Sequence, residues 1–130
     1  MTQEDKKLLI KDLCARLPYG VKIERYSSYY GIVSEIDETY NKIEYFRDFV
    51  GALDITFLDK WIEEYNVKPY LFPLDKISGD MWSEYLATCV GGNASFPTLK
   101  SFEWCNEHHV DYRGLIPKGL ANDATGLNIY

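Results

Sequence analysis

The sequence has little that would mark a membrane, secreted or disulfide-bonded protein. No apolar run approaches the roughly 18 residues that a transmembrane helix needs. The three cysteines, Cys14, Cys89 and Cys105, are odd in number and have no CxxC spacing, which argues against a disulfide framework. The segment Met1 to Lys7 is polar and of mixed charge, unlike a signal peptide. We therefore expect a cytoplasmic protein with free thiols and no membrane span.

Basic residues are also in deficit. The chain has 14 Lys and Arg residues against 20 Asp and Glu residues, which gives a formal net charge of −6. The basic residues are scattered, whereas proteins that bind the phosphate backbone cluster them on one face. Nucleic acid is therefore an unfavoured partner, and an accessory nucleic-acid-binding protein is only the alternative function.

Motifs that bind cofactors or perform catalysis are missing as well. No GK[ST] follows Gly91-Gly92-Asn93, which therefore predicts a helix stop and not a phosphate loop. His108 and His109 are adjacent, so on a helix they would point about 100° apart and would not share a metal ion. Cys105 lies late in its helix, where the helix dipole disfavours a thiolate. We predict no cofactor, metal or catalytic residue; a small hydrolase using His108 or His109 is the third alternative.

The residues that are present are typical of one globular domain. Hydrophobic residues make up 46% of the chain and charged residues 26%, and 130 residues are enough to bury one core. Aromatic residues reach 15%, and Tyr alone accounts for 11 residues, which suits both a core and a contact face. We predict a single domain over residues 1–130.

The first predicted element is a helix. Thr2 fits the N-cap position and Asp5 the capping-box position, and Pro18-Tyr19-Gly20 ends the helix. One buried stripe is predicted at spacing i, i+3, i+4 and i+7, formed by Ile10, Leu13, Cys14 and Leu17.

A two-residue period follows this helix. It predicts short antiparallel strands around 21–24, 30–36 and 42–45, with a fourth around 53–57. Residues 58–65 fit a helical stripe, and Pro69 and Pro73 require an extended or turned chain. Two further helices are predicted with N-caps at Ser78 and Thr98, the second with three residues facing inward: Leu99, Phe102 and Cys105.

The elements together predict an α+β fold. An N-terminal helix packs on a small bent antiparallel sheet or SH3-like half-barrel, followed by two C-terminal helices and a wrapped irregular tail. We expect the tail to be packed, with Arg113 tying it to a carboxylate such as Asp111, Asp123 or the chain terminus. A flexible docking peptide is the alternative. The apolar residues expected to bury the tail are Leu115, Ile116, Leu120, Leu127 and Ile129.

Three phrases of the sequence are familiar as a set. They are Asp12-Leu13-Cys14-Ala15-Arg16-Leu17-Pro18-Tyr19-Gly20-Val21, Val67-Lys68-Pro69-Tyr70-Leu71-Phe72-Pro73-Leu74, and the tail from His109 to Tyr130. Their combination resembles a family of small uncharacterised (pro)phage-type proteins of gut Bacteroides-like bacteria, which has no established activity. The resemblance implies a bacterial cytoplasm and a mobile-element role, and it assigns no catalytic residue.

Tyrosines of the strand region are the candidate binding residues, together with Arg113. Exposed aromatic rings on a small sheet can grip a peptide or stack on bases. Acidic residues interleave with them, which favours a protein partner over nucleic acid. We therefore predict a non-enzymatic intracellular protein-interaction or regulatory module, with the partner and oligomeric state undefined. The tyrosines are Tyr26, Tyr29, Tyr30 and Tyr40.

Overall fold

The computed structural model describes residues 1–25, 29–39, 41–47, 52–63 and 67–130. Two of the candidate binding residues, Tyr26 and Tyr40, lie outside these ranges. Tyr29 and Tyr30 are described only through the backbone of their strand.

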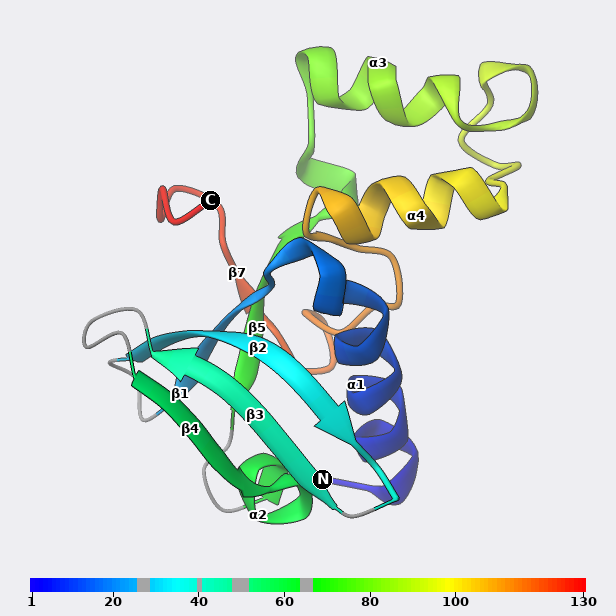
Figure 1. The fold of residues 1–130 in the computed structure, drawn as a ribbon. Coiled ribbons are helices and arrows are strands. Elements are labelled where there is room, and N and C mark those ends of the chain that lie inside the picture. Colours follow the sequence, from blue (N-terminus) through cyan, green and yellow to red (C-terminus); the bar gives the residue numbers. More distant parts are fainter. Residues whose placement is uncertain (26–28, 40, 48–51, 64–66) are drawn as a thin grey trace.

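The described residues form the predicted α+β fold, with an N-terminal helix, a sheet and C-terminal helices (Figure 1). The helices are α1 (Gln3–Arg16), α2 (Leu58–Glu63), α3 (Gly79–Ala87) and α4 (Leu99–Glu107). Short 3₁₀ turns are η1 (Leu17–Tyr19), η2 (Leu74–Lys76) and η3 (Val90–Gly92). The strands are β1 (Lys22–Arg25), β2 (Tyr29–Asp37), β3 (Lys42–Arg47), β4 (Ala52–Phe57), β5 (Lys68–Pro73), β6 (Val110–Asp111) and β7 (Asn122–Asp123).

The sheet is mixed and larger than the sequence predicts. Its strand order is β4-β3-β2-β1-β5-β6, with β7 also pairing with β5. Strands β1 to β4 form the predicted antiparallel meander, and β5 joins the antiparallel part through Ile23 opposite Pro69. The expectation of a wholly antiparallel sheet is wrong, because β6 and β7 both pair with β5 in parallel.

Helix α1 begins as predicted but buries a different face. The Asp5 N–H donates to Thr2 Oγ1 over 3.0 Å, which confirms the N-cap. Ile10 and Leu17, predicted as core, are only half-buried. The buried face is rotated about the helix axis relative to the predicted stripe, because it includes the ion pair between Asp12 and Arg16. The buried residues of the helix are Leu9, Asp12, Leu13 and Arg16.

The apolar residues gather in two clusters. The larger one joins α1, α2 and the sheet, and Figure 1 shows α1 lying against the sheet. The smaller one lies between α3, α4 and β6, and it contains Tyr85, Cys89, Cys105 and Val110. Helices α3 and α4 therefore form a hairpin with a core of its own, which projects beyond the sheet (Figure 1).

Helix α4 has the predicted N-cap but not the predicted orientation. Thr98 and Ser101 form a capping box. Cys105 is buried as predicted, whereas Leu99 is 73% exposed and Phe102 is 38% exposed, so the prediction of inward side chains is wrong for these two. Buried hydrogen bonds set the orientation, because Ser101 Oγ contacts Thr88 and Cys105 Sγ lies in the small core.

The tail after α4 is packed but mostly irregular, as predicted. Leu115 and Leu120 are buried as expected. Leu127 is 46% exposed, so the expectation that it would be buried is wrong. Backbone hydrogen bonds hold the segment, including Leu120 N–H to the Leu115 carbonyl at 2.9 Å and Ala124 N–H to the Leu71 carbonyl at 2.8 Å. Gly119 permits the first of these turns because its φ is +75°.

We expect Arg16→Met to lower the free energy of unfolding by about 3–5 kcal/mol, because it leaves the buried Asp12 carboxylate without its main partner. Urea denaturation of the variant and the parent protein measures this difference. Lys11→Met, on the exposed face of the same helix, is the control and should change stability by no more than about 0.5 kcal/mol. Equal unfolding midpoints for Arg16→Met and the parent would contradict the role given to the pair.

We expect amide hydrogen exchange to divide the tail into two parts. The amides of Leu120 and Ala124 should be protected because they donate to backbone carbonyls. The amides of Asn128 and Ile129 should exchange quickly, since no backbone acceptor is seen for them among the described residues. Random-coil exchange at Leu120 and Ala124 would instead indicate that the tail is a docking peptide.

Candidate functional site

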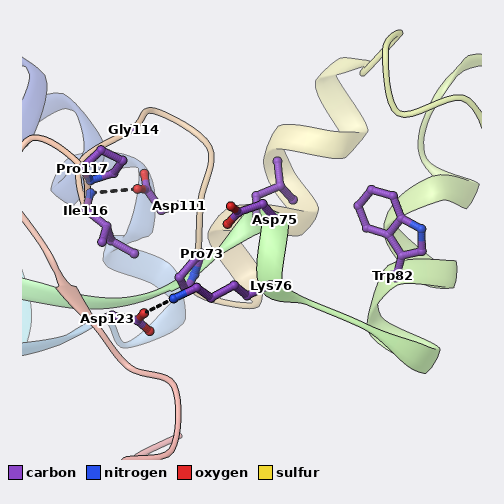
Figure 2. A pocket seen from close by; sticks show the side chains of 10 residues that line it. Pro73, Asp75, Lys76, Trp82, Asp111, Gly114, Ile116, Pro117 and Asp123 are labelled. Carbon is purple, nitrogen blue, oxygen red and sulfur yellow. Dashed lines mark hydrogen bonds and ion pairs between the residues drawn. The ribbon is translucent and has the colours of Figure 1, made fainter.

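A pocket of about 540 Å³ opens where the tail meets the start of the helical hairpin. Figure 2 shows how η2, α3, β6, β7 and the loop after β6 contribute to it. Its lining consists of Pro73, Leu74, Asp75, Lys76, Trp82, Asp111, Gly114, Ile116, Pro117 and Asp123.

The parallel strand pairs bring the polar groups of the pocket together. Asp111 lies opposite Pro73 at the end of β5. Asp123 lies opposite Leu71, two residues earlier in the same strand. Asp75 and its neighbour Lys76 follow directly in η2. Residues from three distant parts of the sequence therefore meet at the end of one strand.

Asp111 is the fixed carboxylate of the pocket. Its oxygens accept hydrogen bonds from the backbone N–H groups of Arg113 at 3.2 Å, Leu115 at 3.1 Å and Ile116 at 2.9 Å. The side chain is buried, and Figure 2 shows it directed at the loop that carries Ile116. These three bonds fix the side chain and shape the loop that follows β6.

Asp123 and Asp75 place two further carboxylates at the pocket. The Thr125 side chain and N–H, the latter at 2.8 Å, hydrogen-bond Asp123 and hold the pKa of that carboxyl below its ordinary value. Lys76 Nζ lies 3.3 Å from Asp123 Oδ2 (Figure 2). Asp75 is exposed and forms no ion pair with another described residue. The pocket lining thus contains three carboxyl side chains and one amino group, and only Asp123 is paired with Lys76.

The remaining walls are apolar. Trp82 stands on the α3 side, whereas Ile116 and Pro117 stand on the tail side (Figure 2). Aromatic and aliphatic walls accept the apolar stem of a ligand, and an indole face also attracts a cation. Among the described residues that line the pocket there is no Ser, Thr, Cys, Tyr or His that could act as a nucleophile or a neutral-pH base. The arrangement is suited to binding.

The two histidines lie outside this pocket. His108 is the C-cap of α4, its Nδ1 lies 2.9 Å from the Trp104 carbonyl, and its ring stacks on Trp104 at 4.3 Å. His109 has a φ of +59°, and its ring stacks on Tyr130 at 3.7 Å. Burial, with a smaller effect of the Arg16 charge, lowers the pKa of His109 to about 4. His109 is therefore neutral at physiological pH.

The cysteines offer no activated thiol among the groups whose pKa is shifted. Burial raises the pKa of Cys105 to about 12, against an opposing effect of the nearby Arg16 charge. Burial also raises the pKa of Cys14. Within the described ranges, His, Cys, Asp and Glu side chains form no group of three or more that could hold a metal ion.

Arg113 ties down the tail, but through a carboxylate that the sequence did not indicate. Its Nε lies 3.2 Å from Asp12 Oδ1 on α1, and its Nη2 donates to the Tyr112 hydroxyl at 2.8 Å. Asp111, one of the predicted partners, accepts a hydrogen bond from the backbone N–H of Arg113 and not from its guanidinium. Arg113 is not among the described residues that line the pocket. Of the four tyrosines, Tyr26 and Tyr40 lie outside the described residues, and Tyr29 and Tyr30 are described only through their backbone.

Sequence reasoning missed the residues that do meet at the pocket. Asp75, Lys76 and Trp82 look like an ordinary polar turn and an amphipathic helix, and Asp123 looks like a turn residue. Only the parallel pairing of β6 and β7 with β5 unites them, and two-residue strands have no periodicity that a sequence pattern can reveal.

Comparison of this chain with protein-family models, with curated proteins and with solved structures finds no match. The resemblance to small (pro)phage-type proteins therefore stays a prediction. In the part of the chain that the structure describes, every helix is too short or too polar to cross a bilayer.

We expect stability to fall between pH 6.5 and about 4 because of His109. The unfolded chain takes up a proton near the ordinary pKa of 6.5, whereas the folded protein does so only near 4. In that window the unfolded state binds more protons, so the free energy of unfolding decreases as the pH is lowered. Urea denaturation across this range measures the slope.

The matched variant is His109→Asn, because asparagine tolerates positive φ and does not titrate. It should have a flatter slope between pH 6.5 and 5, above the range in which ordinary carboxylates dominate. A slope unchanged by His109→Asn would show that another group titrates in this window.

Proposed function

We propose that this protein is a non-enzymatic protein-interaction module whose pocket receives a Lys or Arg side chain of its partner. The observation that carries this proposal is the excess of carboxyl groups in a pocket with apolar walls, whose lining contains Asp75, Asp111 and Asp123 but only one basic residue, Lys76. The partner is a protein with an exposed basic segment, and the interaction takes place in the cytoplasm.

The chemistry of the pocket matches both parts of a basic side chain. The charged head is attracted by Asp75, which is exposed and has no ion pair with another described residue, and by Asp123, which also lines the pocket. The aliphatic stem is covered by Trp82 and Pro117, whose rings need no hydrogen-bond partner from the ligand. Asp111 adds negative charge without being available for direct pairing, because backbone N–H groups occupy its oxygens.

The two other functions considered for this chain receive less support from the pocket. A phosphate group would be repelled by the three carboxylates, which weighs against the accessory nucleic-acid-binding function. A hydrolase using His108 or His109 would need these rings at a ligand site, but both are stacked on aromatic rings away from the pocket. We therefore retain the binding function.

We expect the pentapeptide Ala-Ala-Lys-Ala-Ala with blocked ends, and its Arg counterpart, to bind at the pocket. Two-dimensional NMR titration should move the Trp82 indole signal and the amide signals of Asp75, Ile116 and Asp123. Asp75→Asn and Asp123→Asn should each weaken binding about two- to fivefold, as expected for partly exposed ion pairs. Lys76→Met should strengthen binding, because it removes the competing ammonium group.

The controls separate charge recognition from non-specific binding. Glu84→Gln removes an exposed carboxylate of α3 outside the pocket and should leave the affinity unchanged. A norleucine peptide, which has the stem without the charge, should bind more weakly than the lysine peptide. Equal affinity for the two peptides would refute the proposal. Sub-micromolar, strongly salt-dependent binding of single-stranded DNA or RNA would favour the nucleic-acid function instead.

A further inference from the structure

The tip of the α3–α4 hairpin carries an exposed apolar patch. We define the tip patch as Val90, Phe96 and Leu99, which are 61%, 58% and 73% exposed. The Val90 N–H donates to the Phe96 carbonyl at 3.0 Å, so these two residues lie side by side across the loop. Leu99 follows Phe96 by three residues at the first turn of α4.

Hydrogen bonds fix the tip in this form. Thr98 Oγ1 donates to the Thr88 carbonyl at 2.7 Å, and Thr88 Oγ1 donates to Ser101 Oγ at 2.8 Å. The capping box of Thr98 and Ser101 starts α4 at the same place. Leu99 therefore cannot turn inward without breaking this partly buried polar network. Large apolar side chains held at the surface of a projecting element mark an interaction surface.

Charged residues on α4 indicate what covers the patch. Lys100, Glu103 and Glu107 share the exposed side of the helix, at the spacing i, i+3 and i+7. None of the three forms an ion pair with another described residue. Lys100 and Glu107 are two turns apart, about 10 Å along the axis, so opposite charges stand at the two ends of one face.

The two ends of this pattern, Lys100 and Glu107, are complementary to each other when one copy is reversed. In an antiparallel arrangement, Lys100 of each copy lies opposite Glu107 of the other, which gives two symmetric ion pairs. A parallel arrangement would instead place like charges together. We propose that a second copy of this chain docks on α4 in antiparallel orientation, with the tip patch of each copy at one end of the contact.

Glu103 opposes its own counterpart in this arrangement. It lies near the midpoint between Lys100 and Glu107, so in the antiparallel pair it approaches Glu103 of the other copy. This repulsion is built into the interface, and its removal should strengthen association. The surface is separate from the pocket, which α3 reaches only through Trp82, so the proposal stands independently of the binding function.

Sedimentation velocity over a concentration series up to about 1 mM tests the proposal, since weak dimers dissociate in that range. The parent protein should show a concentration-dependent monomer–dimer equilibrium. Leu99→Asp should raise the dimer dissociation constant at least tenfold, whereas Leu127→Asp, at an exposed leucine of the tail, should not change it. Glu103→Gln should lower the dissociation constant.

A charge exchange decides the orientation. Lys100→Glu and Glu107→Lys should each weaken the dimer about fivefold or more, because each variant opposes like charges twice. The double variant should restore association to near the parent value. A protein that stays monomeric throughout the series overturns the proposal, as does a dimer insensitive to Leu99→Asp. A double variant no better than the single ones would also overturn it, and circular dichroism verifies that each variant is folded.

Discussion

The buried ion pair between Arg16 and Asp12 is the interaction on which the arrangement of the other elements depends. Both side chains are fully buried, and Arg16 Nε lies 2.8 Å from Asp12 Oδ2. A buried guanidinium requires further acceptors, and these are the carbonyls of Cys105 on α4 at 3.2 Å and Val110 on β6 at 2.7 Å. The first helix, the last helix and a sheet edge are therefore joined by one side chain, which connects the two apolar clusters.

The same pair positions the pocket. Asp12 also accepts a hydrogen bond from Arg113, whose guanidinium lies 4.8 Å from the centre of the Tyr112 ring, and the Arg16 guanidinium lies 5.6 Å from the same ring. The chain just after β6 is thus held from both sides. Asp111 follows Val110 in β6, whose carbonyl accepts from Arg16, so contacts made at α1 help to hold the strand that carries its carboxylate. A change at α1 would reach the pocket through this connection.

The meander and the starts of two helices are predictable from the sequence, because residue alternation and capping residues determine these features locally. Alternation predicted the meander, and Thr2 and Thr98 marked the starts of α1 and α4 through their caps. The faces that these helices bury were not predictable from apolar spacing. Asp12 and Arg16 look like solvent-facing residues, and Leu99 looks like a core residue, until their partners from distant segments are known. The pocket follows the same rule, since it is assembled by strands too short to leave a pattern.

The two proposed surfaces differ in the physics that would drive binding. The pocket depends on partly exposed charges, so its affinity should decrease as salt screens them. The tip patch depends mainly on apolar burial, which salt weakens little. Val90 lies beyond the C-terminal end of α3, eight positions after Trp82, and the pocket and the tip patch share no residue. A dimer joined through α4 would present two acidic pockets to one basic partner, and such bivalency raises avidity without any new contact.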